Sequence, residues 1–172
     1  YLHSLHGKRI TVLGIGVSNT PLIKMLCRAD VQVTACDKRT REQLEPVAEE
    51  LESLGVKLFL GSDYLDNLDG DMIFRTPGMR PDLPQIQQAV ERGAKLTSEM
   101  ELFFELCPCK IIAVTGSDGK TTTTTIIAKL LEQAGRNVFL GGNIGKPLLP
   151  DVAGMEPEDI AVLELSSFQL MT

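Results

Sequence analysis

The sequence predicts an α/β protein built from two successive parallel sheets. Short apolar runs rich in Val, Ile and Leu alternate with segments of helical spacing. Two of these runs lead directly into glycine-containing turns that open a helix, one at residues 14–19 and one at 116–122. This strand–turn–helix order is typical of parallel sheets that bind phosphates at a helix N-terminus. Because Cys107-Pro108-Cys109 interrupts the alternation, we expect two domains, residues 1–108 and 109–172.

The composition excludes several classes of protein. Hydrophobic residues make up 43% of the 172 residues and charged residues 23%, as in ordinary globular domains, and no apolar run approaches the ~20 residues that span a bilayer. A net charge of −6 argues against a nucleic-acid surface, which needs a basic face. The four cysteines lack the spacing of a zinc site, so we expect reduced thiols and a cytoplasmic location.

The first domain begins like a Rossmann-like fold. Residues 8–14 form a predicted buried strand, and after the glycine turn a helix is expected over 20–29. The next strand ends at Asp37, about 20 residues after the turn, where a mononucleotide-binding fold places a ribose-reading carboxylate. Asn19 replaces the third glycine of the dinucleotide motif, so the motif is incomplete. The pattern alone leaves open whether this turn binds a nucleotide or only connects strand to helix.

The alternation continues through the first domain. We expect further strands over 56–60, 71–74 and 95–97, and helices over 44–54, over 83–92 after a cap at Asp82, and from Ser98 to Leu106. The strand over 71–74 runs into a loop that contains Thr76, Pro77 and Gly78. Ligands of open parallel sheets bind beyond the carboxyl ends of the strands, so this loop is expected beside the first glycine turn and Asp37. The alternative is an ordinary connection.

The second glycine turn has the pattern of a short phosphate-binding loop. Its glycines allow backbone amides to face an anion, Lys120 can reach β- and γ-phosphate oxygens, and the Thr121 hydroxyl can ligate Mg²⁺. Only Ser117 and Asp118 separate Gly116 from the Gly-Lys pair, two residues fewer than in the usual Walker A pattern. We therefore expect ATP to be bound by Thr115, Gly116, Ser117, Asp118, Gly119, Lys120, Thr121 and Thr122. The alternative is a plain glycine turn followed by a solvated lysine.

A carboxylate follows a later strand of the same unit. The helix expected over 120–134 is followed by a strand over 137–140 and by a buried strand over 160–163 that ends in Glu164. An apolar strand that ends in an acid downstream of a phosphate loop is the Walker B arrangement, so Glu164 is the expected metal partner of Thr121. The alternative is an unpaired carboxylate at a strand end. Three parallel strands form too small a sheet to be stable alone, and we expect the chain to be an N-terminal fragment.

These motifs resemble those of the Mur ligase family of peptidoglycan synthesis. The resemblance rests on the phosphate loop at 114–122, on Gly141-Gly142-Asn143-Ile144-Gly145 and above all on Leu163-Glu164-Leu165-Ser166-Ser167-Phe168-Gln169-Leu170, and it covers nearly the whole chain. The last run is most similar to the family member that adds D-glutamate. The resemblance implies a Rossmann-like domain that holds uridine diphosphate, here residues 1–108, and a central P-loop ATPase domain, here truncated over 109–172. It also implies a third domain, which this sequence lacks.

The same resemblance implies a reaction and a set of residues. ATP and Mg²⁺ would activate the carboxylate of UDP-N-acetylmuramoyl-L-alanine as an acyl phosphate, which D-glutamate would attack. Lys120 and Glu164 would be catalytic, and Thr121 and Glu164 would hold Mg²⁺. Asp118 replaces an asparagine usual in this family. The implied substrate contacts are Gly16, Val17, Ser18, Asn19, Asp37, Lys38, Thr76, Pro77, Gly78, Asn143, Ser166 and Ser167.

Other functions stay open at this point. The first glycine turn and Asp37 could serve a nicotinamide-dependent oxidoreductase, although Asn19 argues against it. A Mur ligase that adds another amino acid and a non-catalytic nucleotide-binding module are the further alternatives. The expected partners are the uridine-linked substrate and D-glutamate, with neither nucleic acid nor membrane insertion, and we expect a monomer. Alone, the fragment is expected not to ligate, although its first domain could still bind UDP.

Overall fold

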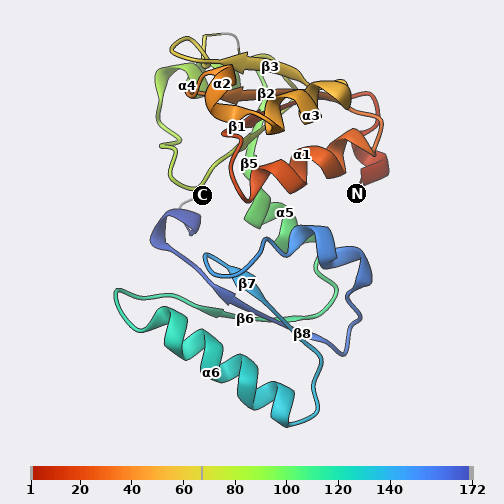
Figure 1. Cartoon of the computed structure of the whole chain (residues 1–172), viewed down its shortest axis with the longest axis vertical. Coiled ribbons are helices and arrows are strands. Elements are labelled where there is room, and N and C mark those ends of the chain that lie inside the picture. Colours follow the sequence, from red (N-terminus) through yellow and green to blue (C-terminus); the bar gives the residue numbers. More distant parts are fainter. Residues whose placement is uncertain (1, 67, 171–172) are drawn as a thin grey trace. The chain divides into compact units, whose positions relative to one another are not determined.

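The computed structural model describes residues 2–66 and 68–170 (Figure 1). The chain divides into two compact units, Tyr1–Glu99 and Met100–Thr172. The sequence predicts the boundary at Cys107-Pro108-Cys109, so the two divisions differ in where they assign helix α5 (Glu99–Leu106). Met171 and Thr172, the end of the predicted second domain, lie outside the described residues. The α/β fold expected from the sequence is confirmed, with parallel strands in both units.

A five-stranded parallel sheet forms the first unit. Its strands lie in the order β3-β2-β1-β4-β5. Leu13, the last residue of β1, pairs with Cys36 of β2 and with Arg75 of β4, so these three strands end together at one edge of the sheet. The strand bounds are Arg9–Leu13 for β1, Gln32–Asp37 for β2, Lys57–Leu60 for β3, Met72–Arg75 for β4 and Lys95–Ser98 for β5.

Helices cover both faces of this sheet. Leu13 and Ile73 pack against Ile86 and Ala89 of α4 on one face. The connection through α1 moves along the sheet in the opposite direction from the connection through α4, and right-handed crossovers therefore place α1 on the other face. The helices of this unit are η1 (Leu2–Leu5), α1 (Asn19–Cys27), α2 (Arg41–Leu44), α3 (Val47–Ser53) and α4 (Pro84–Glu91).

Two helix predictions in the first unit are wrong in detail. The single helix expected over 44–54 is two helices, α2 and α3, because Glu45, which precedes Pro46, is extended. A residue that precedes proline is disfavoured in the helical region. The predicted cap Asp82 does not cap α4, which follows Leu83 and has Pro84 in its first turn. The Asp82 carboxylate instead pairs with Arg80.

A smaller sheet forms the second unit. Its three parallel strands lie in the order β6-β8-β7, and α6 packs Ala128 against Ile160 and Val162 of β8. Every residue of β8 is buried, whereas the two edge strands are mostly half-buried, so the core is centred on β8. The bounds are Lys110–Val114 for β6, Lys120–Gln133 for α6, Val138–Gly142 for β7, Leu149–Gly154 for η2, Ile160–Glu164 for β8 and Ser167–Gln169 for η3.

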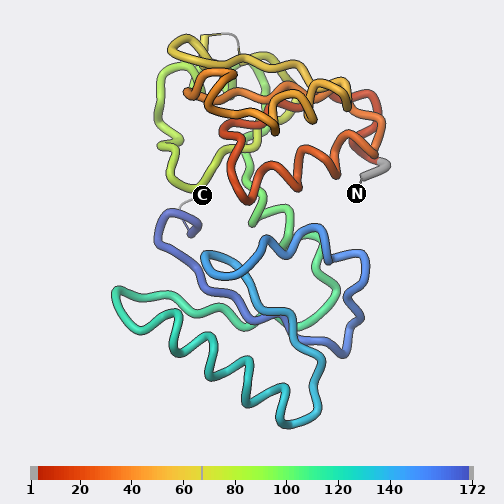
Figure 2. The backbone as a smooth tube through the Cα atoms, in the orientation of Figure 1, coloured from red at the N-terminus to blue at the C-terminus, as the bar shows by residue number. Residues whose placement is uncertain are grey.

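The strand register of this unit places its predicted site residues at one end of the sheet. Glu164, the last residue of β8, pairs with Val114 on one side and with Gly142 on the other. The loop between β6 and α6 projects beyond this end of the sheet (Figure 2). The loop and Glu164 therefore lie at the same edge, as expected for the carboxyl ends of parallel strands.

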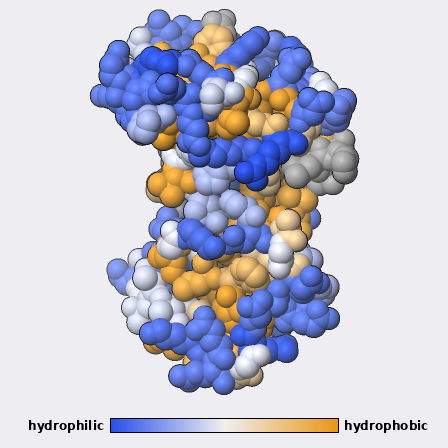
Figure 3. All heavy atoms as spheres, turned by 45° about the vertical axis from the view of Figure 1, so that its right-hand side comes forward, coloured by the Kyte–Doolittle hydropathy of each residue, from blue (hydrophilic) through white to orange (hydrophobic). Residues whose placement is uncertain are grey.

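Apolar side chains also reach the surface of the second unit. Orange areas mark such side chains among the polar ones in Figure 3. On α6, Ile126 is 52% and Leu130 is 60% exposed.

Within the described residues, no helix combines the length and the apolar character needed to cross a membrane.

Candidate functional site

The first unit has a cavity at the carboxyl ends of its strands. Its volume is about 510 Å³, within the range of small-molecule sites. The turn after β1, the end of β2 and the loop after β4 meet around it, as the sheet topology predicts. Six residues of the predicted turns line it, namely Gly14, Gly16, Asp37, Lys38, Thr76 and Gly78. The sequence argument that these segments lie side by side is confirmed.

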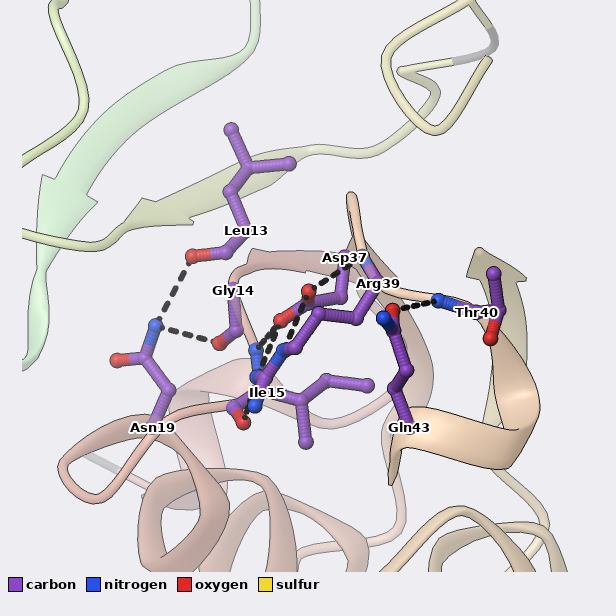
Figure 4. A network of polar contacts seen from close by, with 8 residues as sticks. All are labelled: Leu13, Gly14, Ile15, Asn19, Asp37, Arg39, Thr40 and Gln43. Carbon is purple, nitrogen blue, oxygen red and sulfur yellow. Dashed lines mark hydrogen bonds and ion pairs between the residues drawn. The ribbon is translucent and has the colours of Figure 1, made fainter. Parts of the chain in front are cut away.

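Asp37 is bound on all sides by the protein (Figure 4). Its Oδ2 accepts hydrogen bonds from the backbone N–H of Ile15 at 2.7 Å and from Arg39 Nη2 at 2.7 Å. Its Oδ1 accepts from the backbone N–H and Nε of Arg39, both at 2.9 Å. The same guanidinium donates to the Ile15 carbonyl at 2.6 Å. The carboxylate is thereby neutralised and fastens the first glycine turn to β2.

The pKa of Asp37 reflects this arrangement. Burial disfavours the ionised carboxyl, but the bonds from Arg39 and from the Ile15 amide outweigh burial and hold its pKa below the usual value. The residue is only 5% exposed. A ribose hydroxyl that used this carboxylate would have to share it with these existing donors.

Asn19 has a structural part in the same turn. Its side chain is 2% exposed, and Nδ2 donates to the carbonyls of Leu13 and Gly14, both at 3.0 Å (Figure 4). The predicted contacts Asn19, Val17, Ser18 and Pro77 do not line the cavity.

Gly14 lines the cavity and has a φ of +90°. A Cβ added at this position would lie only 3.3 Å from Thr76 Cγ2. A glycine is therefore needed where the turn approaches the loop after β4.

Several lining residues were missed by sequence reasoning. They come from the loops after β2, β3 and β4, and they are Arg39, Tyr64, Met79, Arg80 and Leu83. Burial first, and then the charge of Asp37, raises the pKa of Tyr64. The buried Arg75 donates to the carbonyls of Pro77 and Met79 at 3.4 and 3.3 Å and so shapes the last of these loops. The only available signal was the proximity of Arg39 and Arg80 to predicted site residues in the sequence.

The predicted phosphate-binding loop of the second unit is open to solvent. Gly119 precedes α6 in the left-handed conformation, with φ of +72°, and Gly116 has φ of +150°. Lys120, the first residue of α6, folds back so that Nζ donates to the carbonyls of Gly116 at 2.9 Å and Ser117 at 3.1 Å. Thr115, Ser117, Asp118 and Thr122 are exposed. The loop thus has the glycine conformations and the adjacent cation of an anion site.

Hydrogen bonds to Glu164 connect the start of α6 with Asn143, the residue that follows β7. The Thr121 hydroxyl donates to Glu164 Oε2 at 2.6 Å, and Asn143 Nδ2 donates to Oε1 at 3.2 Å. The backbone N–H of Asn143 also donates to the Glu164 carbonyl at 2.7 Å. Gly142 permits this approach, because an added Cβ would lie 2.2 Å from that carbonyl oxygen. Three predicted residues, Thr121, Asn143 and Glu164, are therefore brought together.

The charge of Glu164 distinguishes this site. Its side chain is only 2% exposed, yet both of its hydrogen-bond partners are neutral. Among the described residues, no ion pair involves Glu164. A buried carboxylate is stable only when a cation or several hydrogen bonds compensate its charge. This edge is therefore suited to receive a cation.

The Thr121–Glu164 pair fits Mg²⁺. Both groups offer oxygen, the ligand that this ion prefers, and two adjacent ligands of an octahedral Mg²⁺ lie about 2.9 Å apart. The observed separation of 2.6 Å needs only a small adjustment. Within the described residues, no cluster of three or more His, Cys, Asp or Glu side chains could hold a metal by itself. Phosphate oxygens and water would have to complete the coordination.

The remaining predicted residues have other partners. Ser166 caps η3, since its Oγ accepts from the Gln169 N–H at 3.3 Å, and Ser167 is exposed in η3. The later threonines of α6 bond back to the helix: Thr124 Oγ1 donates to the Lys120 carbonyl, and Thr125 Oγ1 donates to the Thr121 carbonyl. These two hydroxyls therefore serve the first turns of the helix.

Comparison with protein families gives two matches that together span most of the chain. Residues 8–98 match the family described as "Mur ligase MurD-like, N-terminal domain", and residues 114–172 match "Mur ligase middle domain". A murein peptide ligase of Psychrobacter arcticus, solved by crystallography, has a similar fold. Its TM-score is 0.50 at 21% identity, over 93% of this chain and 37% of that one.

Two curated relatives are more similar in sequence. The UDP-N-acetylmuramoylalanine--D-glutamate ligase of Ruminiclostridium cellulolyticum is 60% identical over 166 residues, and the enzyme of that name from Clostridium botulinum is 54% identical over 166 residues. In both cases the match covers 96% of this chain and 36% of the relative. The chain thus spans little more than a third of the length of these relatives.

Proposed function

The chain belongs to the Mur ligase family, and on this premise we propose that it is the nucleotide-binding part of an ATP-dependent ligase that joins D-glutamate to UDP-N-acetylmuramoyl-L-alanine. The names of the two curated relatives support this choice of substrates. Because the chain spans little more than a third of these relatives, we propose the whole reaction for the full-length protein. It would place the protein in peptidoglycan synthesis, and its use of ATP and a uridine nucleotide agrees with the expected cytoplasmic location.

In this proposal, the first unit holds the uridine diphosphate moiety. The cavity of about 510 Å³ is large enough for a nucleoside, and Lys38, Arg39 and Arg80 supply positive charge around it. Arg39 is partly committed to Asp37, and Arg80 to Asp82. The apolar side chains Met79 and Leu83 offer surface for a base. The incomplete dinucleotide motif agrees with a mononucleotide ligand rather than a nicotinamide cofactor.

The second unit would bind the triphosphate of ATP. Backbone amides of the loop and the N-terminus of α6 face the phosphates, and Lys120 leaves its carbonyl partners to contact β- and γ-phosphate oxygens. Thr121 and Glu164 would hold Mg²⁺, which supplies Lewis-acid neutralisation of phosphate charge when bound. The Asn143 side chain orients the Glu164 carboxylate by donating a hydrogen bond to Oε1.

The proposed chemistry has two steps. A carboxylate oxygen of the alanyl group attacks the γ-phosphorus of ATP, and the bond to the bridging oxygen breaks as ADP leaves. The D-glutamate amine then attacks the acyl carbon, the C–O bond to phosphate breaks, and the nitrogen loses a proton. Lys120 contributes by neutralising the negative charge of the phosphoryl group during its transfer. The observation that carries the proposal is the contact of Thr121 with the buried Glu164, which forms no ion pair with any of the described residues.

A phosphate-release assay on the full-length protein tests this proposal. Release should require ATP, UDP-N-acetylmuramoyl-L-alanine and D-glutamate together, and Lys120→Ala should lower turnover by about 10³-fold or more. Lys129→Ala, which removes an exposed lysine from the same helix, is the matched control and should leave turnover unchanged. Undiminished turnover in Lys120→Ala would overturn the mechanism. Product formation only with UDP-muramate or a UDP-muramoyl dipeptide would instead indicate a ligase for another amino acid.

A further inference from the structure

Three sulfur atoms meet at the start of β6, away from the phosphate loop. Cys107 Sγ lies 3.4 Å from Cys109 Sγ and 4.0 Å from Met155 Sδ. Cys107 and Cys109 lie in the segment between α5 and β6, and Met155 directly follows η2. Two segments 46 or more residues apart in sequence thus contribute one group of sulfur atoms, which we name the sulfur cluster.

The sulfur cluster is enclosed but accessible from one side. Cys109 is 8% and Met155 is 5% exposed, whereas Cys107 is half-buried and faces solvent in part. Both cysteines are free thiols. The fixed φ of the intervening Pro108 limits the backbone freedom between them. An ion could therefore enter beside Cys107 and be held against two groups that are already in place.

The distances suit one shared metal ion. Sulfur atoms bound to one ion at about 2.3 Å lie about 3.8 to 4.0 Å apart at tetrahedral to trigonal angles. The Cys107–Cys109 separation of 3.4 Å and the Cys107–Met155 separation of 4.0 Å each lie within about half an ångström of this range.

The donor set selects the kind of ion. Two thiols and a thioether are soft ligands, which favour Cu(I), whereas Zn²⁺ sites are built from thiolate, imidazole and carboxylate groups. The nearby carboxylate of Asp159 is already engaged, because it accepts from Asn137 Nδ2 at 2.9 Å and from the Glu156 N–H at 2.8 Å. We propose that Cys107, Cys109 and Met155 form a binding site for a soft monovalent cation, Cu(I) among the biological metals.

Binding balances in charge and protons. Cu(I) replaces the protons of both thiols, so that two S–H bonds break, two Cu–S bonds form and two protons are released to solvent, while the neutral Met155 thioether adds the third bond.

A bound ion would cross-link two parts of the second unit. It would tie the residues before β6 to the end of η2, and β6 is the strand that leads into the phosphate loop. Binding is separate from the proposed ligase chemistry, since none of the three sulfur residues belongs to the phosphate site. The consequence to measure is metal-dependent stability, which increases with the free ion concentration.

Titration of the full-length protein with Cu(I) under anaerobic, reducing conditions tests the site. The probe is Cu(I) in competition with the chromophoric chelator bathocuproine disulfonate. Met155→Leu keeps the volume of the side chain and removes its sulfur, and it should weaken binding about tenfold or more. Cys107→Ser should weaken binding further. Cys27→Ser, which alters a half-buried cysteine of α1, is the matched control and should bind as the parent does.

Two further readouts make the outcome decisive. Thermal melting without metal checks that each variant is folded, and X-ray absorption of the Cu(I) complex should show three sulfur neighbours at about 2.3 Å. Equal affinity in the parent and both cluster variants would overturn the proposal. It would also be overturned if the cysteines were oxidised to a disulfide, seen as a loss of two hydrogens by mass spectrometry, without any retention of copper.

Discussion

The two glycine turns of this chain are built on one plan and differ in how they treat a carboxylate. In each unit a strand runs through a glycine turn into a helix, and an acid ends the neighbouring strand: Asp37 of β2 and Glu164 of β8. Asp37 is paired with the guanidinium of Arg39, whereas Glu164 accepts hydrogen bonds from the neutral groups of Thr121 and Asn143. Both side chains are at least nine-tenths buried.

This difference indicates which of the two carboxylates can interact with a positively charged ligand or ion. The protein itself neutralises Asp37, so that carboxylate orders the turn and contributes little net field to the cavity. The hydrogen bonds to Glu164 come from neutral groups, which hold a carboxylate in place but bring no opposite charge. The first turn is therefore suited to a ligand that brings no cation, and the second to a ligand that arrives with one.

Of the two carboxylates compared, Glu164 should give the larger effect when its charge is removed. Glu164→Gln keeps the shape and one acceptor oxygen, but it removes the negative charge proposed to hold Mg²⁺. Turnover of the full-length protein should fall by about 10²- to 10³-fold, the size typical for losing one electrostatic contribution to a transition state. Steady-state phosphate release at several Mg²⁺ concentrations measures it, and partial recovery at high Mg²⁺ is expected. Unchanged turnover would make Glu164 a structural carboxylate like Asp37.

Asp37→Asn should affect stability more than chemistry. The amide cannot pair with Arg39 and offers only one acceptor oxygen to the four donors around it, so the free energy of unfolding should drop by about 2 kcal/mol. Urea unfolding monitored by circular dichroism measures the drop. If this variant kept its stability and lost UDP binding, measured by calorimetry, Asp37 would act as a ligand-reading carboxylate after all.

The pH dependence of this stability difference has a definite sign. Because the pKa of Asp37 is lowered by folding, its contribution is complete above the unfolded value near 3.8 and is lost as pH falls through the lower folded pKa. The difference between parent and Asp37→Asn should therefore be constant near neutrality and shrink below about pH 4. Unfolding curves at pH 7 and at successively lower pH values down to 2.5 check this trend.

The smallest expected effect concerns the phosphate loop. Asp118 is exposed and places a negative charge beside the expected phosphates. Asp118→Asn removes that charge and should tighten ATP binding about two- to threefold, a change limited by solvent screening. Calorimetry at low and high salt measures it, and the gain should diminish as salt is added. Weaker binding of ATP by the variant would show that Asp118 takes part in holding the nucleotide or its metal.

Local sequence patterns predicted most of the fold and the site at Thr121 and Glu164. Strands and glycine turns follow from apolar runs and short-range chemistry, and parallel pairing then places Thr121 beside Glu164 without further information. The splitting of the expected helix over 44–54 depended on Pro46, whose effect on the preceding residue overrides the apolar spacing.

Tertiary contacts account for what the sequence did not predict. Nothing in the pattern distinguishes an Asp37 that awaits a ribose from one already bound by Arg39, because both need a carboxylate at the end of β2. Tyr64 enters the cavity from a loop without a motif. Met155 reads as an ordinary apolar residue until the fold places its sulfur next to Cys107. These contacts join residues whose separation along the chain carries no signal.

The folded-back position of Lys120 determines what can displace it. The Lys120 ammonium donates to the carbonyls of Gly116 and Ser117 and thereby stabilises the conformation of the loop. An incoming ligand must exchange these two bonds for better ones, which a single weakly charged group does poorly and a polyphosphate does well. The loop should therefore discriminate against single anions such as chloride or acetate in favour of a polyphosphate.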